Sequence, residues 1–292
     1  MRRSLFLDKS LLHDPHDRDS WAQLLELVRQ HRPTPEQRQL IERALTQFPG
    51  DILFIEAALD MALAGGAFKK ATHLAQEILR HDAIHVAAQE KLIAAHLAHL
   101  RKQVKAGRLD LARKELQLGQ AAKQKWVRQT SYPLMACQSL LELLESGDAA
   151  ANRVEITVPE GSTASQQLEL LFLLALEAGR MQIPSQQRLV FTKRLEQHLR
   201  KECRKTDFLH LMTLVSRQQA IAGKTALLEL LQSLRTALNR FATETYQREE
   251  MERLCDLLYR LPLLPVLAAF AKAAQRRWSG LPVWTFYTVY AK

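Results

Sequence analysis

The chain has 292 residues, 47% hydrophobic and 25% charged, with 10 glycines, 10 prolines and a net charge of +10. This composition predicts a folded, mainly helical protein and excludes general disorder. The three cysteines, Cys137, Cys203 and Cys255, form no CxxC pair, which argues against disulfides or a zinc site and favours a reducing compartment.

Residues 1–17 are expected to form an N-terminal arm. Arg2 and Arg3 are similar to the start of a twin-arginine export signal, but charged residues such as Asp8 and Lys9 follow instead of an apolar run. We therefore expect a cytoplasmic protein. No run approaches the ~20 apolar residues of a membrane span, so no membrane partner is expected.

Residues 20–85 contain the same pair of short helices twice, with an offset of 34 residues. Positions related by this offset are small or apolar in both copies at five of the six pairs compared; Thr34 and Phe68 are the exception. The pairs are Leu24 and Ala58, Leu25 and Leu59, Val28 and Ala62, Ile41 and Ala75, and Ala44 and Ile78. Helix starts are marked by a capping box at Thr34 to Gln37, and by Asp51 and Asp207 as caps. Each helix has one apolar stripe, so a helix pair must stack on the next pair to bury it.

The two copies together resemble the tetratricopeptide repeat (TPR) family. The residues that carry the resemblance are Trp21 in the first helix, Gly66 and Phe68 at the inter-helix turn, and Ala71 where the helices touch. The family has a period of ~34 residues and a helix-turn-helix unit. The resemblance covers the N-terminal half and implies antiparallel helix pairs with a groove lined by the first helix of each pair.

A third unit should begin near Val86, but its turn glycine, Gly107, comes seven residues later than the period requires. Seven residues are about two helical turns, so the first helix can lengthen without rotating its apolar face. We therefore predict a long first helix from Val86 to Ala106, with Leu109, Ala112 and Leu116 buried in its partner.

The second half of the chain is also predicted to be helical, without a repeat of 34 residues. The expected domains are repeats over 18–147, a linker over 148–163 that contains a lone extended segment, and a C-terminal helical domain over 164–292. Helices are expected at about 164–180, 185–204, 207–222, 224–246, 247–260 and 264–279. The predicted fold class is all-α: a TPR-like α-solenoid of antiparallel helix pairs followed by a degenerate helical array.

Catalytic signatures are not found in the sequence, and no enzymatic activity or cofactor is expected. There is no phosphate-binding glycine loop, HExxH or GxSxG motif. His81 and His85, and His96 and His99, have spacings that would place each pair on one helix face. Without a nearby Cys or carboxylate cluster, we interpret them as solvated helix histidines and predict no metal site.

Positive charge is concentrated in two parts of the chain. Residues 101–128 hold 9 basic and 2 acidic residues, whereas residues 129–179 hold 1 basic and 7 acidic ones. We expect basic ridges that contact an acidic protein surface or nucleic-acid phosphates, although no nucleic-acid recognition motif accompanies them. The first ridge comprises Arg101, Lys102, Lys105, Arg108, Arg113, Lys114, Lys123, Lys125 and Arg128, and the second comprises Lys193, Arg194, Arg200, Lys201, Arg204 and Lys205.

A partner groove on the first helices is what the family resemblance implies. Its expected lining residues are Ala22, Glu26, Arg29, Glu56, Asp60 and Leu63. The Lys and Asn that clamp a C-terminal carboxylate in one subgroup of the family are missing, since Ala22, Glu26 and Ala57 stand at the matching positions. The acidic residues favour a basic or apolar partner segment.

The sequence therefore predicts a non-catalytic adaptor or scaffold that binds another protein. The alternative is a basic α-solenoid that binds nucleic acid. Three interpretations stay open for the aromatic residues near the end of the sequence: they fold back onto the body, contact a partner, or belong to a fragment of a longer protein. These residues are Trp284, Phe286, Tyr287 and Tyr290.

Overall fold

The computed structural model describes residues 2–29, 35–126, 131–146, 161–219 and 224–291. Within these ranges all regular secondary structure is helical, which confirms the all-α fold class. The chain forms two compact units, Met1–Ser131 and Tyr132–Lys292, and each is considered by itself.

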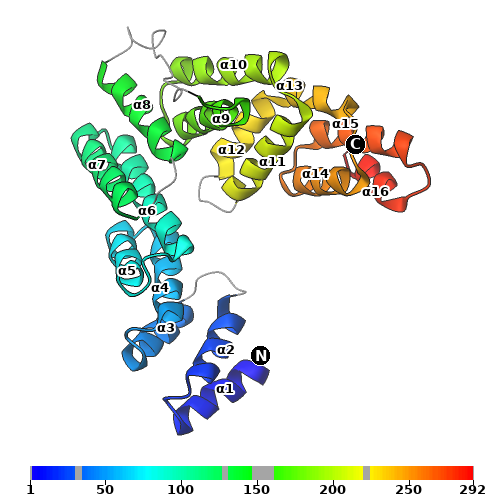
Figure 1. Ribbon diagram of the computed structural model, residues 1–292. Helices are drawn as coiled ribbons and strands as arrows, with labels where there is room; N and C mark the ends of the chain where they lie inside the picture. Colours follow the sequence, from blue (N-terminus) through cyan, green and yellow to red (C-terminus); the bar gives the residue numbers. More distant parts are fainter. Residues whose placement is uncertain (1, 30–34, 127–130, 147–160, 220–223, 292) are drawn as a thin grey trace. The chain divides into compact units, whose positions relative to one another are not determined.

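The first unit consists of helices that pack in adjacent pairs along the chain (Figure 1). Its helices are α1 (Arg2–His13), α2 (Arg18–Arg29), α3 (Pro35–Gln47), α4 (Ile52–Ala64), α5 (Phe68–His81), α6 (Val86–Lys105) and α7 (Leu109–Trp126). Residues 2–13 are therefore helical and pack on α2, whereas the sequence suggested an arm at 1–17.

Burial follows the 34-residue offset in all three first helices, α2, α4 and α6. Leu24 and Leu25 on α2 are buried, and so are Ala58 and Leu59 on α4. A further step of 34 positions leads to Leu92 and Ile93 on α6, which are also buried. The predicted apolar stripes are thus confirmed as the core of this unit, because each stripe is covered by the neighbouring helices.

Two inter-helix turns have the same backbone geometry. Gly66 follows α4 and Gly107 follows α6, and both have φ +70, a conformation that side-chain-bearing residues rarely adopt. In each turn the following residue closes a helix-ending hydrogen bond: the Ala67 amide donates to the Ala62 carbonyl at 2.9 Å, and the Arg108 amide donates to the Gln103 carbonyl at 3.0 Å. The predicted turn glycines are therefore at equivalent positions of two helix pairs.

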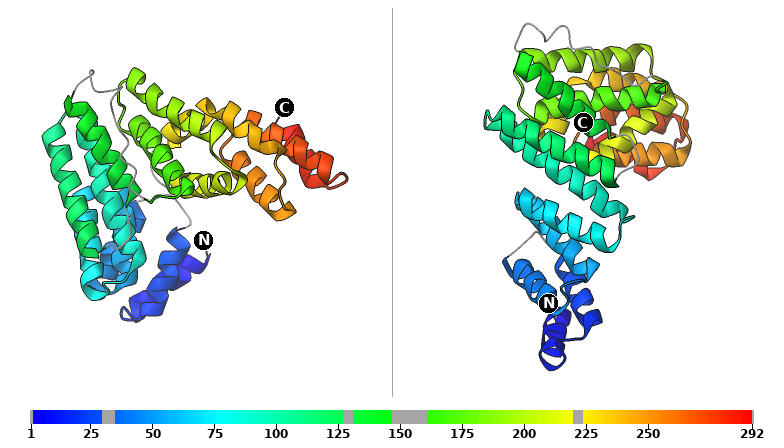
Figure 2. Two further views of the ribbon diagram at one scale, coloured as in Figure 1. Left: turned by 45° about the horizontal axis from the view of Figure 1, so that its top comes forward. Right: turned by 60° about the vertical axis from the view of Figure 1, so that its left-hand side comes forward.

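The predicted lengthening of α6, the first helix of the third helix pair, is also confirmed. α4 has 13 residues and α6 has 20, so the difference is the seven residues expected from the delayed glycine. The partner helix lengthens too, from 14 residues in α5 to 18 in α7. Figure 2 shows α6 and α7 as a long antiparallel pair.

The second unit is built around α9. Its helices are α8 (Tyr132–Ser146), α9 (Ala164–Arg180), α10 (Ser185–Lys201), α11 (Lys205–Gln219), α12 (Lys224–Ser233), α13 (Arg235–Asn239), the 3-10 helix η2 (Arg240–Thr243), α14 (Arg248–Arg260), α15 (Leu264–Arg277) and α16 (Pro282–Tyr290). α8, α10, α11 and α12 all contact α9. Phe208, Phe241 and Phe270 form a buried aromatic stack, with centroids 4.4 Å and 5.7 Å apart, that joins α11, η2 and α15.

The division between the units lies between Ser131 and Tyr132, whereas the sequence placed the end of the repeats at residue 147. The physical reason is the apolar face of α8. Leu134, Cys137 and Leu141 are buried, and α8 contacts α9 in the second unit. The segment of unusual composition after α8 therefore connects two helices of one unit.

Two predicted helix limits were wrong. The helix expected over 224–246 is broken into α12, α13 and η2, which lets Leu234, Phe241 and Tyr246 all reach the core. α11 begins at Lys205, so Asp207 is in its first turn and is not the cap. The Asp207 carboxylate instead accepts a hydrogen bond from the Arg204 amide at 3.0 Å, the return bond of a capping box.

Some predictions fall on residues that the structure does not describe. They are Thr34 of the capping box, most of the 148–163 linker with its extended segment, and Arg128 of the first basic ridge. Asp51 is confirmed as a cap, because its carboxylate accepts a hydrogen bond from the Leu53 amide at 3.0 Å.

Candidate functional site

An ion pair joins the starts of the first helices α2 and α4. The Arg18 guanidinium bonds both carboxylate oxygens of Asp51, with Nη2 3.2 Å from Oδ1. Asp51 also caps α4, so one carboxylate fixes the start of its own helix and contacts the helix of the preceding pair. Two-pronged contacts of this kind between a guanidinium and a carboxylate hold a defined geometry.

A second group of charges joins α4 and α6. Lys91 Nζ on α6 lies 2.9 Å from Glu56 Oε1 and 2.6 Å from Asp60 Oδ1, both on α4. The three side chains are half-buried. Glu56 and Asp60 were expected to make the groove acidic, but Lys91 offsets one of their two charges. Lys91 was not among the residues predicted for the groove, although it stands 35 residues after Glu56, one more than the period of the repeat.

Small side chains follow Lys91 along α6. Ala94 and Ala98 are three and seven residues further on, which places them on the same helix face as Lys91. Both are half-buried, whereas Ala88 and Ala95, which flank Lys91 on the edge that packs into the core, are fully buried. An alanine stripe next to a charge cluster is a surface that the side chains of another segment can approach closely.

We define the first-helix face as Ala22, Glu26, Glu56, Asp60, Leu63, Lys91, Ala94 and Ala98. Ala22 and Leu63 are half-buried and Glu26 is exposed. Arg29 ends α2, and its side chain lies outside the described part of the chain. Of the predicted groove residues, the structure therefore brings Glu56 and Asp60 into direct contact with a common cation.

The two histidines on the lengthened helix share one carboxylate. His96 Nδ1 lies 3.0 Å from Glu115 Oε2, and His99 Nδ1 lies 2.9 Å from Glu115 Oε1. The His99 ring also contacts the Phe68 ring at 5.9 Å. His96 is buried, so the interpretation of this pair as solvated was wrong. Glu115 ties α7 to α6 at the point where the helix pair lengthens.

The other histidine pair has a different role. The His85 side chain caps α6, since its Nδ1 accepts a hydrogen bond from the Ala88 amide at 3.2 Å, while His81 is exposed at the end of α5. Across the described residues, no group of three or more His, Cys, Asp or Glu side chains is arranged to hold a metal ion.

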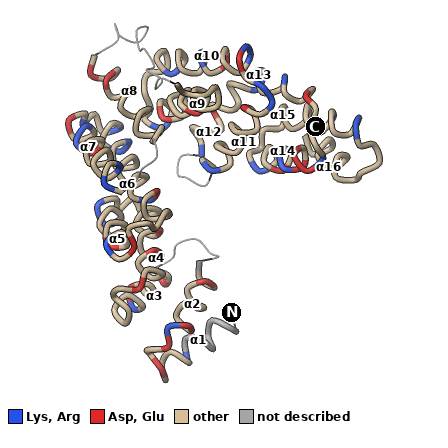
Figure 3. The backbone as a smooth tube through the Cα atoms, viewed as in Figure 1, with Lys and Arg blue, Asp and Glu red and all other residues tan. Residues whose placement is uncertain are grey.

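The first basic ridge is mostly exposed on α6 and α7, where Figure 3 shows the Lys and Arg positions. Lys102, Lys105, Arg108, Arg113, Lys114 and Lys125 are exposed, and Arg101 and Lys123 are half-buried. The Lys125 ammonium lies 4.7 Å from the centroid of the Trp126 ring. Because Glu115 is bound to the two histidines, Asp110 is the remaining acid of this segment.

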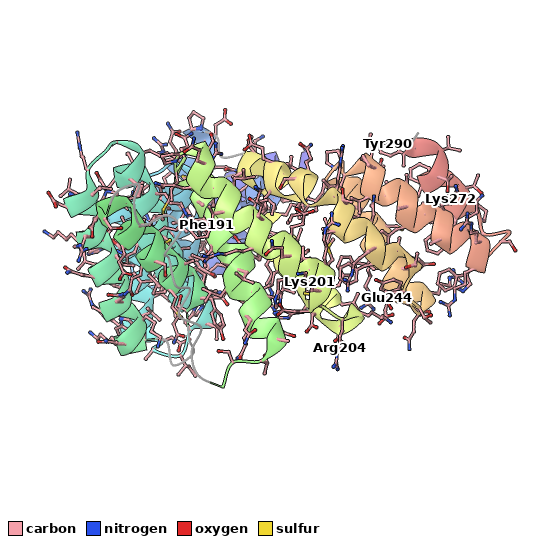
Figure 4. All side chains as sticks on the ribbon, turned by 90° about the horizontal axis from the view of Figure 1, so that it is seen from above. Phe191, Lys201, Arg204, Glu244, Lys272 and Tyr290 are labelled. Atoms are coloured by element: carbon pink, nitrogen blue, oxygen red, sulfur yellow. The ribbon has the colours of Figure 1, made fainter. Side chains whose placement is uncertain are left out.

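The second basic ridge is partly neutralised by acidic side chains. Arg200 pairs with Glu196 at 2.7 Å, and Lys205 pairs with Glu250 at 2.6 Å. The exposed members of this ridge are Lys193, Arg200, Lys201 and Arg204, while Arg194 and Lys205 are half-buried. Figure 4 shows Lys201 and Arg204 close together at the end of α10.

The aromatic residues near the end of the sequence fold back onto their own unit. α16 packs on α15, and Trp284 is fully buried, with its ring 5.7 Å from that of Trp278. Tyr259 on α14 contacts the Tyr290 ring at 4.5 Å. Phe286 and Tyr290 still expose about half of their surface, 51% and 46%.

Two of the buried thiols are held in their protonated form. Burial raises the pKa of Cys255 to about 12, and burial, with the Asp207 carboxylate as a lesser cause, raises the pKa of Cys203 to about 12. Thiols with such pKa values carry almost no thiolate near neutral pH, which is the form that attacks substrates.

Comparison of the chain with models of known protein families and with curated proteins finds no match. In the part of the chain that is described, no helix combines the length and the apolar character needed to cross a membrane.

Proposed function

We propose that this protein is a non-catalytic adaptor or scaffold that binds a partner protein on the first-helix face, in the manner of the TPR family that its N-terminal half resembles. One observation carries the proposal: charge clusters tie consecutive first helices together, while small side chains beside them stay accessible. Arg18 with Asp51, and Lys91 with Asp60, form these links.

The partner segment proposed for this face is apolar with at least one basic residue. Its apolar side chains would lie against Leu63, Ala94 and Ala98, which are half-buried on α4 and α6. Glu26 is exposed on α2 and forms no ion pair with a described residue, so it can accept the basic residue. Preformed surfaces of this kind lose little freedom on binding.

The test is affinity purification of the tagged full chain with mass spectrometry, with and without nuclease, followed by measurement of the affinity for the recovered protein. Ala94→Arg places a long cation in the alanine stripe and Glu26→Ala removes the exposed acid. We expect each to weaken binding about tenfold or more. Ala273→Arg on α15 is the matched control, because Ala273 is also a half-buried helical alanine.

Unchanged capture by Ala94→Arg, or equal loss in the Ala273→Arg control, would sink the first-helix face as the binding surface. Circular dichroism of each variant must match the parent chain, so that lost capture reports the surface and not unfolding.

The alternative function, nucleic-acid binding, is supported by the exposed cations of α6 and α7. Lys102, Lys105 and Lys114 form no ion pair with a described acidic residue. A protein that neutralises several phosphates loses affinity steeply as salt rises. Titration of duplex and single-stranded probes at low and high salt tests it; absence of binding at low salt dismisses this alternative.

A further inference from the structure

α7 carries a second accessible stripe, along the edge of its buried face. Its buried residues are Ala112, Leu116, Gly119 and Ala122, which pack towards α6. Leu111 and Leu118 lie at the edge of this buried face and expose 45% and 44% of their surface. Single exposed leucines are common on proteins and need no explanation. These two are seven residues apart, so they lie on one line along the helix.

Two lysines alternate with these leucines. Lys114 is three residues after Leu111 and four before Leu118, and Lys125 is seven residues after Leu118. Both lysines are exposed. We call Leu111, Lys114, Leu118 and Lys125 the α7 stripe. Leu111 and Leu118 are one heptad apart, the spacing of successive contact positions where one helix packs along another, and charged residues commonly flank such contacts.

The surroundings of the α7 stripe are positively charged. Lys102 and Lys105 at the end of α6, and Arg108 in the turn, are exposed next to the start of α7. Of the two acidic residues on α7, Glu115 is bound to His96 and His99, so Asp110 alone faces the surrounding basic residues. The field therefore favours a negatively charged partner.

The leucines decide between two classes of acidic partner. Nucleic acid is bound through phosphate contacts and by stacking of bases on aromatic rings, neither of which uses a leucine side chain. Trp126, the aromatic residue at the end of α7, is half-buried and already contacts Lys125. An amphipathic helix with acidic residues beside its apolar line matches both the leucines and the lysines.

We propose that the α7 stripe binds an acidic amphipathic helix of a partner protein. Leu111 and Leu118 pack against the apolar line of that helix, and Lys114 and Lys125 pair with carboxylates at its edges. No residue of the α7 stripe belongs to the first-helix face, so this surface acts independently of the proposed function.

The experiment uses the full chain and a synthetic fluorescent peptide. The peptide has the length of α7, 18 residues, with leucines at the a and d positions of a heptad and glutamates beside them. Fluorescence anisotropy gives the dissociation constant. A second peptide has the same composition in scrambled order, and polyglutamate of equal length measures attraction by charge alone.

Two sets of variants separate the apolar and the charged contributions. Leu111→Ser with Leu118→Ser, and Lys114→Glu with Lys125→Glu, are each expected to weaken binding of the heptad peptide by about tenfold or more. The matched control is Leu189→Ser with Lys193→Glu, an exposed leucine and lysine four residues apart on α10. It is expected to bind like the parent chain.

The proposal is overturned by any of three results: equal affinity of the leucine variant and the parent chain, equal loss in the α10 control, or equal binding of the heptad and scrambled peptides. A duplex or single-stranded oligonucleotide is also tested as a competitor of the heptad peptide. If the oligonucleotide binds the parent chain and the leucine variant equally well and displaces the peptide, the surface is assigned to nucleic acid instead. Glu56→Ala with Asp60→Ala, on the first-helix face, must leave binding of the heptad peptide unchanged. Failure of the α7 stripe as a binding surface is therefore distinguishable from failure of the first-helix face.

Discussion

Lys91 Nζ on α6 lies 2.6 Å from Asp60 Oδ1 on α4, and these two residues belong to consecutive first helices of the first unit. Glu56, one turn earlier on α4, contacts the same ammonium at 2.9 Å. Two carboxylates so close together repel each other, and a cation between them offsets this repulsion. Lys91 therefore both links the helices and makes the acidic pair tolerable at a half-buried position.

Replacement of Lys91 by Met is expected to lower the free energy of unfolding by about 0.2–1 kcal/mol, the range for exposed ion pairs. Methionine keeps the apolar stem, so the loss reports the charge. Urea unfolding followed by circular dichroism measures it, with Lys102→Met, an exposed lysine on the same helix, as the control. The difference should shrink as salt rises, because salt screens the repulsion left on α4. A loss that is equal at low and high salt would contradict the electrostatic explanation.

The offset of 34 residues predicted the helix pairs of the first unit and their buried stripes. It could do so because burial in a helix pair depends on the spacing of apolar residues along the chain. Leu59 and Ile93 are buried for the same reason, and Gly107 marks the lengthened pair. The family resemblance stays a prediction, since the helical arrangement does not by itself identify a family. The contacts of Lys91 and Glu115 could not be predicted, because they depend on how neighbouring helices are rotated.

The second unit was harder to predict from its sequence. No glycine or proline marks the break between α12 and α13, so local propensity favours one continuous helix over Lys224–Ser233 and Arg235–Asn239. The aromatic stack of Phe208, Phe241 and Phe270 requires the break, because a straight helix would carry Phe241 away from the other rings. Tertiary packing here outweighs helix propensity.

The turn glycines should not tolerate a side chain. Gly66 and Gly107 have φ +70, and Gly107 has no atom within 4 Å of an added Cβ. The cost of alanine there is therefore conformational, about 1–2 kcal/mol at each position. Gly50→Ala is the control, because Gly50 also has open space but no positive φ. Thermal unfolding of the three variants would contradict the assignment if Gly107→Ala lost no more stability than Gly50→Ala.

Arg240 connects η2 to the end of α10. Its guanidinium donates hydrogen bonds to the Arg200 carbonyl and, at 2.6 Å, to the Cys203 carbonyl. Loss of hydrogen bonds from a charged group costs about 1.5–3 kcal/mol, so Arg240→Met should destabilise the second unit by that amount. Arg240→Lys should recover little, since an ammonium cannot reproduce the planar fork. Arg235→Met, an exposed arginine on α13, is the control in urea unfolding; equal losses in the two Met variants would refute this role.

Cys255 gives the chain a dependence on alkaline pH. Burial raises the pKa of its thiol to about 12, whereas in the unfolded chain the pKa is about 8.5. Between these values the unfolded state has lost a proton that the folded state retains, so the free energy of unfolding falls as pH rises, by up to about 1.4 kcal/mol per pH unit. Below pH ~7 the thiol is protonated in both states and contributes no slope.

Replacement of Cys255 by Ala removes this contribution and leaves the other groups in place. The variant is expected to differ from the parent chain by a constant amount between about pH 6 and 7, where the difference reflects the lost sulfur contacts. Above pH ~9 the difference should narrow, because only the parent chain loses stability through this thiol. Urea unfolding at closely spaced pH values gives both curves. Parallel curves up to about pH 10.5 would show that the thiol ionises equally in the folded and unfolded states, contrary to its complete burial on α14.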